Sequence, residues 1–210
     1  MVKLYACLGS GNCFKPWLVM TQLGLDFETE LIDVLSGEQK KQTYLEVNPL
    51  GVVPFLQTDD GAELGESNAM IWYLSEGTHL MPETAAERAE ALQWMFFEQS
   101  KLEMFISPAR FFTTIVPEQR AAHASEVADW QQKAKPGLLR LDSHLSTRAF
   151  ILNSGYSVAD IAMFGYVHVI SEAGFSVCDY PNIERWIEGV AMTDHFSPLS
   201  QLGQLVEQAA

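Results

Sequence analysis

The first eighty residues alternate between short apolar runs and longer amphipathic stretches, a pattern that predicts a mixed α/β region. A hairpin turn at Asp59-Asp60-Gly61 separates the last two apolar runs. Strands are expected over residues 3–8, 27–34, 52–57 and 62–64, and helices over residues 14–23, 37–46 and 67–76. The predicted order of elements is βαβαββα.

From residue 84 onward the strand pattern gives way to helical spacing of apolar residues, which predicts an all-helical region. Pro136 lies inside one predicted helix and is expected to kink or split it, because proline lacks the N–H and clashes with the preceding turn. The break around Pro82 is read as a linker between domains at 1–79 and 84–210. Helices are expected over residues 84–112, 118–145, 157–172, 181–190 and 197–207.

The charge balance excludes one class of partner. The 210 residues are 48% hydrophobic, an ordinary globular composition, but 13 Lys plus Arg face 27 Asp plus Glu, for a net charge of −14. Phosphate backbones repel such a surface, so neither nucleic acid nor an anionic membrane is expected as a partner. Apolar runs are too short to span a bilayer, and Lys3 and Gly9 interrupt any leader-type core, so secretion is not expected.

The cysteines and histidines narrow the chemistry further. Cys7, Cys13 and Cys178 are odd in number and contain no CxxC pair, which favours a reducing compartment and a cytoplasmic protein. The five histidines lack metal-ligand spacing, so no metal site is expected. HExxH, GxSxG and Walker-type motifs are absent from the sequence, which argues against zinc-protease, serine-hydrolase and nucleotide chemistry.

A capping box opens the helix expected after residue 157. In Ser157-Val158-Ala159-Asp160 the serine oxygen is placed to accept from the helix start, and the aspartate is placed to reach back to the serine N–H. We interpret Asp160 as structural rather than catalytic.

Four segments together resemble the cytosolic glutathione transferases, in a bacterial branch of that family. They are NPLGVVP at 48–54, GESNAM at 65–70, WMFFEQ at 94–99 with ARF at 109–111, and YSVADIA at 156–162. The resemblance covers essentially the whole chain. It implies a thioredoxin-like N-terminal domain, a helical C-terminal domain, a homodimer, and a detoxifying transfer of glutathione to hydrophobic electrophiles.

The implied reaction needs the thiol of glutathione in its anionic form. A free thiol has a pKa of about 8.5, and lowering it by about two units needs roughly 2.7 kcal/mol of selective stabilisation of the anion. By resemblance, Ser10 is the donor to the glutathione sulfur and Asn12 is a second donor. Both residues lie at the turn before the first helix, where the helix N-terminus adds partial positive charge. Two alternatives stay open: Ser10 and Asn12 only cap the helix, or Cys13 forms a mixed disulfide with glutathione.

The resemblance also assigns residues to the peptide of glutathione. Val53 precedes Pro54, a proline that is cis in the family, and the Val53 backbone is expected to pair with the tripeptide in the manner of an added strand. Glu66 and Ser67 are expected to bind the γ-glutamyl ammonium and carboxylate at the start of a helix. The glycyl carboxylate is assigned to Gln39 and Lys40. Gln39 stands where many relatives have histidine, and Val52 where they have lysine or arginine.

The electrophile site is expected between the two domains, because most of the rate acceleration must come from holding the electrophile against the sulfur. Its predicted wall includes Phe14, Trp94, Arg110 and Phe111, although an aromatic stripe at helical spacing is more often core than pocket. Two other functions remain open: a glutathione-dependent disulfide or peroxide reductase, and a non-catalytic interaction module with the same fold.

Overall fold

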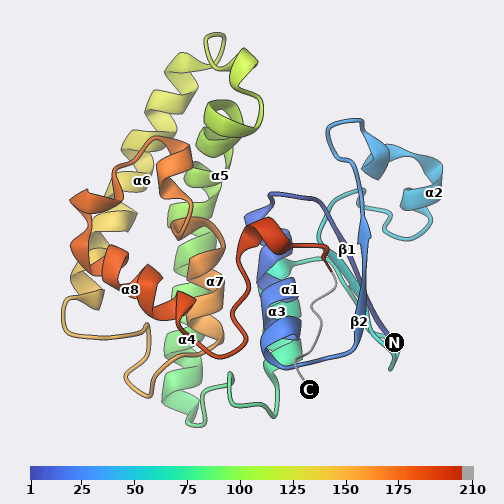
Figure 1. Cartoon of the computed structure of the whole chain (residues 1–210), viewed down its shortest axis with the longest axis horizontal. Coiled ribbons are helices and arrows are strands. Elements are labelled where there is room, and N and C mark those ends of the chain that lie inside the picture. Colours follow the sequence, from blue (N-terminus) through green and yellow to red (C-terminus); the bar gives the residue numbers. More distant parts are fainter. Residues whose placement is uncertain (205–210) are drawn as a thin grey trace. The chain divides into compact units, whose positions relative to one another are not determined.

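The computed structural model describes residues 1–204, and the chain divides into two compact units (Figure 1). The first unit combines Met1–Thr78 with the residues from Thr193 onward, and the second is His79–Met192. Each unit is described by itself below.

The first unit is built on a four-stranded mixed sheet with strand order β2-β1-β3-β4. Its strands are β1 (Val2–Ala6), β2 (Phe27–Leu31), β3 (Phe55–Gln57) and β4 (Glu63–Leu64). β1 is parallel to β2 and antiparallel to β3. This arrangement confirms the predicted thioredoxin-like order.

Helices α1 (Gly11–Gln22) and α3 (Ser67–Ser75) pack against one face of this sheet (Figure 1). Almost every residue of α1 is buried, which explains why its sequence is apolar nearly all round rather than along one stripe. The predicted polar helix at 37–46 is instead a 3₁₀ turn, Glu38–Lys40, followed by the short α2 (Gln42–Leu45). Lys41 between them is extended, at φ −73° and ψ 149°, and this conformation interrupts the helix.

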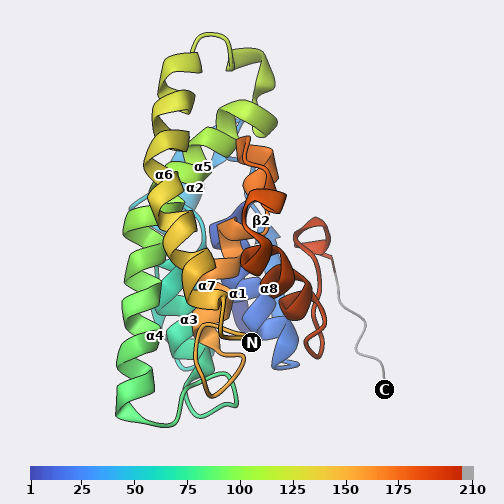
Figure 2. The same ribbon diagram turned by 90° about the vertical axis from the view of Figure 1, so that its left-hand side faces the viewer.

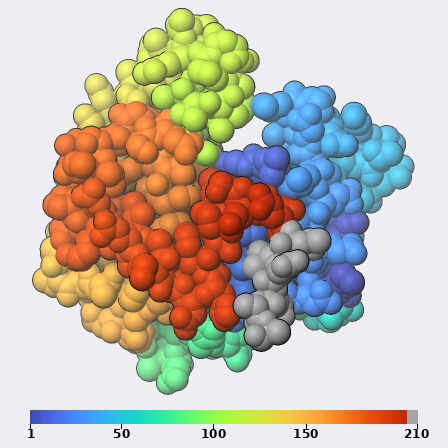
Figure 3. Space-filling model, in the orientation of Figure 1, coloured from blue at the N-terminus to red at the C-terminus, as the bar shows by residue number. Residues whose placement is uncertain are grey.

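The residues from Thr193 to Gln204 were predicted to lie in the helical domain, but they belong with the first unit. Gln22 Nε2 of α1 donates to Thr193 Oγ1 at 2.8 Å and to the Asp194 carbonyl oxygen at 3.4 Å, contacts that no sequence pattern signals. Figure 3 shows these red residues lying against the blue surface of the same unit. Of the helix expected over 197–207, the described part holds a 3₁₀ turn, Leu199–Gln201, and the remainder lies outside the described residues.

The second unit is helical over most of the expected regions, but residues 120–123 form a turn before the helix that begins at Ala124. α4 (Ala85–Phe97) and α5 (Met104–Arg110) are joined by a π-helical segment, Glu98–Glu103, and a second one, Phe111–Ile115, follows. α7 (Val158–Val167) is wholly buried and packs against α4, α5 and the π-helical segment Glu98–Glu103 (Figure 2). None of the described helices is both long and apolar enough to cross a membrane. The unit also contains α6 (Ala124–Leu145) and α8 (Pro181–Ala191).

Pro136 does not split its helix, because α6 continues through it from Ala124 to Leu145. The next residue, Gly137, lies where α6 approaches the π-helical segment most closely. A Cβ on Gly137 would lie 2.7 Å from Leu102 Cδ2 and 2.9 Å from the Lys101 carbonyl oxygen. The close packing at this point therefore depends on the absence of a side chain.

The capping box at the start of α7 is confirmed, and its aspartate also binds neighbouring segments. The wholly buried Asp160 accepts from the backbone N–H of Ser157 at 3.0 Å and of Ile151 at 2.9 Å. It also accepts from Trp186 Nε1 at 2.9 Å. Asp160 thus joins α7, α8 and the preceding loop, which supports its structural interpretation.

Candidate functional site

Ser10 lies at the turn between β1 and α1, where it caps the helix. Its Oγ accepts from the backbone N–H of Cys13 at 3.2 Å. A serine hydroxyl has two lone pairs and one hydrogen, so accepting this bond leaves the O–H able to donate to another group. The capping role and the predicted thiol-activating role are therefore compatible in one side chain.

The start of α1, directly after this turn, is connected to the start of α3 by two polar contacts. Ser67 Oγ donates to Asn12 Oδ1 at 3.2 Å. The wholly buried Lys15 donates from Nζ to Asn68 Oδ1 at 3.3 Å. The structure therefore brings together two predicted sets of residues, the thiol-activating turn and the γ-glutamyl end. Lys15 and Asn68 were missed by the sequence reasoning, because a buried lysine in an apolar helix carries no spacing signal.

The loop before β3 presents the backbone expected to bind a tripeptide. The Val53–Pro54 bond is cis, as predicted. The Val52 carbonyl oxygen accepts from Tyr44 Oη at 2.8 Å and from Asn48 Nδ2 at 2.9 Å, which fixes the loop from behind. Burial raises the pKa of Tyr44 to about 12, so this phenol stays protonated and donates at neutral pH.

Gly51 allows the same loop to pass close to its neighbours. Its φ of 60° is in the left-handed region that favours glycine. A Cβ at this position would lie 2.8 Å from the Gln39 carbonyl oxygen and 2.9 Å from Leu45 Cδ2. The glycine in the sequence motif is therefore required by both backbone angle and space.

The two residues predicted for the glycyl carboxylate lie beside this loop. Lys40 Nζ donates to the Gly51 carbonyl oxygen at 2.7 Å, and Gln39 Nε2 donates to the Val34 carbonyl oxygen at 3.3 Å. Gln39 Oε1 is buried without a hydrogen-bond partner. The Lys40 side chain supports this loop, whereas the Gln39 side chain bonds to the segment after β2, and the contact of either with a ligand stays a prediction. Glu66, predicted for the γ-glutamyl ammonium, is exposed just before α3.

Cys13 is poorly suited to attack glutathione directly. Its side chain is wholly buried, and its sulfur accepts from the backbone N–H of Cys7 at 3.3 Å. Burial, and then the neighbouring Cys7 thiol, raise the pKa of Cys13 well above its usual value. Reactive cysteines have lowered pKa values and solvent access, so these observations favour Ser10 and Asn12 as the sulfur-facing pair.

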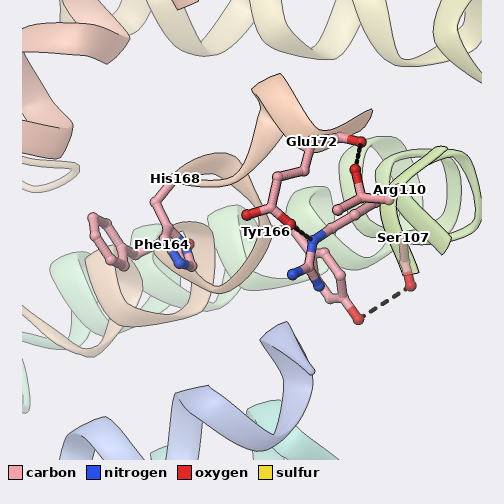
Figure 4. Close-up of polar contacts among 7 residues, drawn as sticks. Ser107, Arg110, Phe164, Tyr166, His168 and Glu172 are labelled. Atoms are coloured by element: carbon pink, nitrogen blue, oxygen red, sulfur yellow. Dashed lines mark hydrogen bonds and ion pairs between the residues drawn. The ribbon is translucent and has the colours of Figure 1, made fainter. Parts of the chain in front are cut away.

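The helical unit holds a second polar cluster, which includes the predicted residue Arg110 (Figure 4). Arg110 Nε, on the last turn of α5, donates to Glu172 Oε2 at 2.8 Å. Ser107, one turn earlier on α5, donates to Tyr166 Oη of α7 at 3.1 Å. Figure 4 shows the Arg110 and Tyr166 side chains lying side by side. Sequence reasoning missed Ser107, Tyr166 and Glu172, because the contacts join residues about sixty positions apart.

His168 borders this cluster as a neutral group. Its ring stacks on Phe164 at a centroid distance of 4.4 Å, and Nδ1 contacts the Phe164 carbonyl oxygen. Burial lowers the pKa of His168 to about 4, and the positive charge of Arg110 contributes to the same shift. At neutral pH the cluster therefore carries the Arg110–Glu172 pair beside an uncharged imidazole.

The other predicted wall residues have different surroundings. Phe14 is wholly buried in the first unit and stacks on Trp17. Trp94 is buried in the second unit, where it packs on His144 at a centroid distance of 4.3 Å. Phe111 is partly exposed and lies edge-on to Phe112. Their role toward an electrophile stays a prediction. Residues 1–204 contain no cluster of three or more potential metal ligands.

A thioredoxin-like unit with a cis-proline loop, followed by a helical unit, defines a class of two-domain thiol-handling proteins. Family models place the chain within this class. Residues 9–76 match the glutathione S-transferase N-terminal domain, and residues 118–189 match the C-terminal domain. The chain belongs to the glutathione S-transferase family.

Solved structures agree with this assignment. A glutathione S-transferase from Pseudomonas fluorescens Pf-5 is 33% identical, with a TM-score of 0.90 over 94% of this chain and 98% of that one. A possible glutathione S-transferase from Rhodopseudomonas palustris is 36% identical, with a TM-score of 0.91 over 100% of this chain and 93% of that one. A glutathione transferase from Burkholderia graminis, solved with two glutathione molecules per subunit, is 27% identical, with a TM-score of 0.77 over 96% of this chain and 86% of that one.

One curated relative carries a different name. Elongation factor 1-gamma from Artemia salina is 30% identical in an alignment 197 residues long. The alignment covers 88% of this chain and 43% of that protein. The chain thus spans less than half the length of this relative.

Proposed function

We propose that this chain binds glutathione on its first unit and conjugates the thiolate of glutathione to hydrophobic electrophiles. The observation that carries the proposal is the hydrogen bond from Ser67 Oγ to Asn12 Oδ1 at 3.2 Å. It joins the turn that would hold the sulfur to the helix start that would hold the γ-glutamyl group, so both ends of one small ligand have partners in one place. The glutathione-bound neighbour supports the same ligand.

The peptide part of glutathione would lie along the cis-proline loop. The Val53 backbone offers main-chain groups to an extended tripeptide, as in strand addition. The γ-glutamyl carboxylate would lie at the start of α3, where the N-cap residue Glu66 makes no side-chain hydrogen bond to the helix. A helix N-terminus favours an anion, and the backbone N–H of Ser67 is among its donors, because the single hydroxyl hydrogen of Ser67 is engaged by Asn12 Oδ1. Exposed Glu66 is then left to pair with the γ-glutamyl ammonium.

The sulfur would be stabilised as a thiolate at the β1–α1 turn. Ser10 would donate its O–H, and Asn12 would donate from its amide nitrogen, since its oxygen is already engaged by Ser67. Each hydrogen bond to a charged acceptor contributes about 1.5–3 kcal/mol, so one or two can lower the thiol pKa by about two units. The start of α1 adds partial positive charge in the same direction.

The helical unit would supply the electrophile wall. Arg110 and the Tyr166–Ser107 hydroxyl pair lie together on α5 and α7 and can bind polar substituents of an otherwise apolar electrophile. Phe111 follows directly in the chain and adds apolar surface. The homodimer and the cytoplasmic location implied by the resemblance are part of this proposal.

Steady-state kinetics with glutathione and a chlorodinitrobenzene electrophile tests the proposal. Ser10→Ala should lower kcat/KM by about tenfold to a hundredfold, because it removes one donor to the charged sulfur. The matched control is Ser154→Ala, which changes an exposed serine of the helical unit and should leave kcat/KM unchanged. Full activity in Ser10→Ala would overturn the proposed role of the turn.

Two other functions make different predictions in the same assays. A glutathione-dependent disulfide or peroxide reductase would retain disulfide reduction in Ser10→Ala while losing conjugation. A non-catalytic module, the reading that the elongation-factor relative favours, would show no change in melting temperature with millimolar glutathione. A ligand present at about a hundred times its Kd stabilises a protein by about 2.7 kcal/mol, so real binding is easily measured.

A further inference from the structure

Two cysteine side chains meet across the β1–α1 turn, one on each side of Ser10. Cys7 directly follows β1 and is partly exposed, whereas Cys13 lies in the first turn of α1 and is wholly buried. The Cys7 backbone N–H donates to Cys13 Sγ at 3.3 Å. The sulfur of Cys13 therefore lies directly beside residue 7, although the two cysteines are six positions apart.

The two thiols also interact with each other. A hydrogen bond to the Cys7 side chain and the Cys7 charge both contribute to the raised pKa of Cys13. A disulfide needs Cβ atoms about 3.5–4.5 Å apart and a torsion near 90° about the S–S bond. The nitrogen and the Cβ of Cys7 are both bonded to its Cα, and the Cys13 sulfur lies beside that nitrogen. Rotation about the Cα–Cβ bond of Cys7 can therefore bring its sulfur toward the Cys13 sulfur.

We propose that Cys7 and Cys13 form a dithiol redox site, which small disulfides oxidise to an intramolecular disulfide. In the first step the Cys7 thiolate attacks the disulfide, forms a mixed disulfide and releases one thiolate, which takes up a proton. In the second step Cys13 attacks the Cys7 sulfur, forms the Cys7–Cys13 bond and expels the second thiol. Two protein thiols are oxidised, and one small disulfide is reduced to two thiols.

Exposure assigns the order of the two steps. Cys7 is the accessible member and meets the oxidant, while Cys13 is wholly buried with its sulfur beside residue 7. Attack by a neighbouring thiol is favoured by its high effective concentration, which compensates for the small thiolate fraction of a thiol with a raised pKa. Cys178 is exposed in the helical unit and serves as an internal comparison.

Thiol counting on the intact chain tests this site. The reduced protein is incubated with hydroxyethyl disulfide, acid-quenched, unfolded and titrated for free thiols, and its intact mass is measured. Because this oxidant does not resemble glutathione, the result is independent of the proposed glutathione site. Free thiols should fall from three to none: exposed Cys178 should keep a mixed disulfide with the small thiol, whereas Cys7 and Cys13 should lose two hydrogens in a mapped Cys7–Cys13 crosslink.

Single substitutions separate the two steps. Cys13→Ser should stop at a stable mixed disulfide on Cys7, and Cys7→Ser should keep Cys13 unmodified. The matched control, Cys178→Ser, should fall from two thiols to none. Three remaining thiols in the treated wild type would overturn the proposal, as would a stable mixed disulfide on its Cys7 or a crosslink to Cys178. The wild-type measurement decides the question even where a variant fails to fold.

Discussion

The two units build their polar sites in different ways. In the first unit, a backbone loop is held by Tyr44 and Asn48, and the β1–α1 turn is joined to α3 through Asn12 and Ser67. In the helical unit, Arg110 and its partners are side chains brought together from separate helical segments. A site made of backbone needs particular residue types at particular spacings, whereas a site made of side chains on helices can be assembled from many sequences. Two of the four family motifs lie in the first unit and form its backbone loop and helix start, and the specificity of the proposed reaction depends on the second unit.

The largest effect is expected when the support of the helical unit is broken. Asp160→Ala removes the acceptor of four buried donors, two on Ser157 and one each on Ile151 and Trp186, and each orphaned donor costs about 1–3 kcal/mol. We expect the free energy of unfolding to fall by about 3–5 kcal/mol in denaturant titrations. The exposed Asp129→Ala is the control and should change it by less than about 0.5 kcal/mol. Equal losses in both variants would contradict the assigned role.

Acid should destabilise the helical unit through His168. Because its folded pKa is lowered from 6.5 to about 4, the stability that neutral His168 contributes is complete above pH 6.5 and is lost as the pH falls toward 4. The difference corresponds to about 3 kcal/mol. His168→Phe keeps the stacking on Phe164, and its free energy of unfolding should fall by about 3 kcal/mol less than that of the wild type between pH 6.5 and pH 4. Parallel slopes in wild type and variant would contradict the prediction.

In the first unit, Gly51→Ala should disturb the proposed tripeptide loop. The substitution places a Cβ on a residue whose backbone is left-handed, and this Cβ would lie 2.8 Å from the Gln39 carbonyl oxygen. We therefore expect the free energy of unfolding to fall by about 2–3 kcal/mol and calorimetry to show weaker glutathione binding. Gly37→Ala is the control. At φ 79°, with no atom within 4 Å of the added Cβ, it has only the backbone cost and should bind glutathione normally.

The smallest effect is expected from the Arg110–Glu172 pair. Glu172→Gln should change stability by about 1 kcal/mol or less, since the carboxylate is 37% exposed. It should nevertheless change KM for polar electrophiles more than KM for glutathione, because Arg110 loses its charged partner. The same variant with an apolar electrophile serves as the comparison. An equal change in both KM values would place Arg110 outside the electrophile wall.

The sequence predicted most of the first unit, because turns, caps and the cis-proline loop each require particular residues. Gly51 is a clear example, since backbone angle and space leave few alternatives, and the Ser157–Asp160 capping box shows the same for hydrogen bonding in the helical unit. Lys41 shows the limit, because one extended residue interrupts a segment whose composition predicted a helix.

Contacts between distant side chains could not be predicted in the same way. The Ser107–Tyr166 hydrogen bond and the placement of Thr193 against Gln22 each depend on one polar pair, and such a pair leaves no periodic pattern in a sequence. Pro136 illustrates the opposite case, in which a strong local signal for a helix break was overridden by packing along α6.

The central claim is that the β1–α1 turn holds the sulfur of glutathione as a thiolate. Ultraviolet difference spectroscopy of the complex, titrated with pH, measures the thiol pKa of bound glutathione directly. The account predicts a pKa about one to two units below that of free glutathione in the wild type, and a value closer to the free one in Ser10→Ala. An unshifted thiol pKa in a saturated wild-type complex would contradict it.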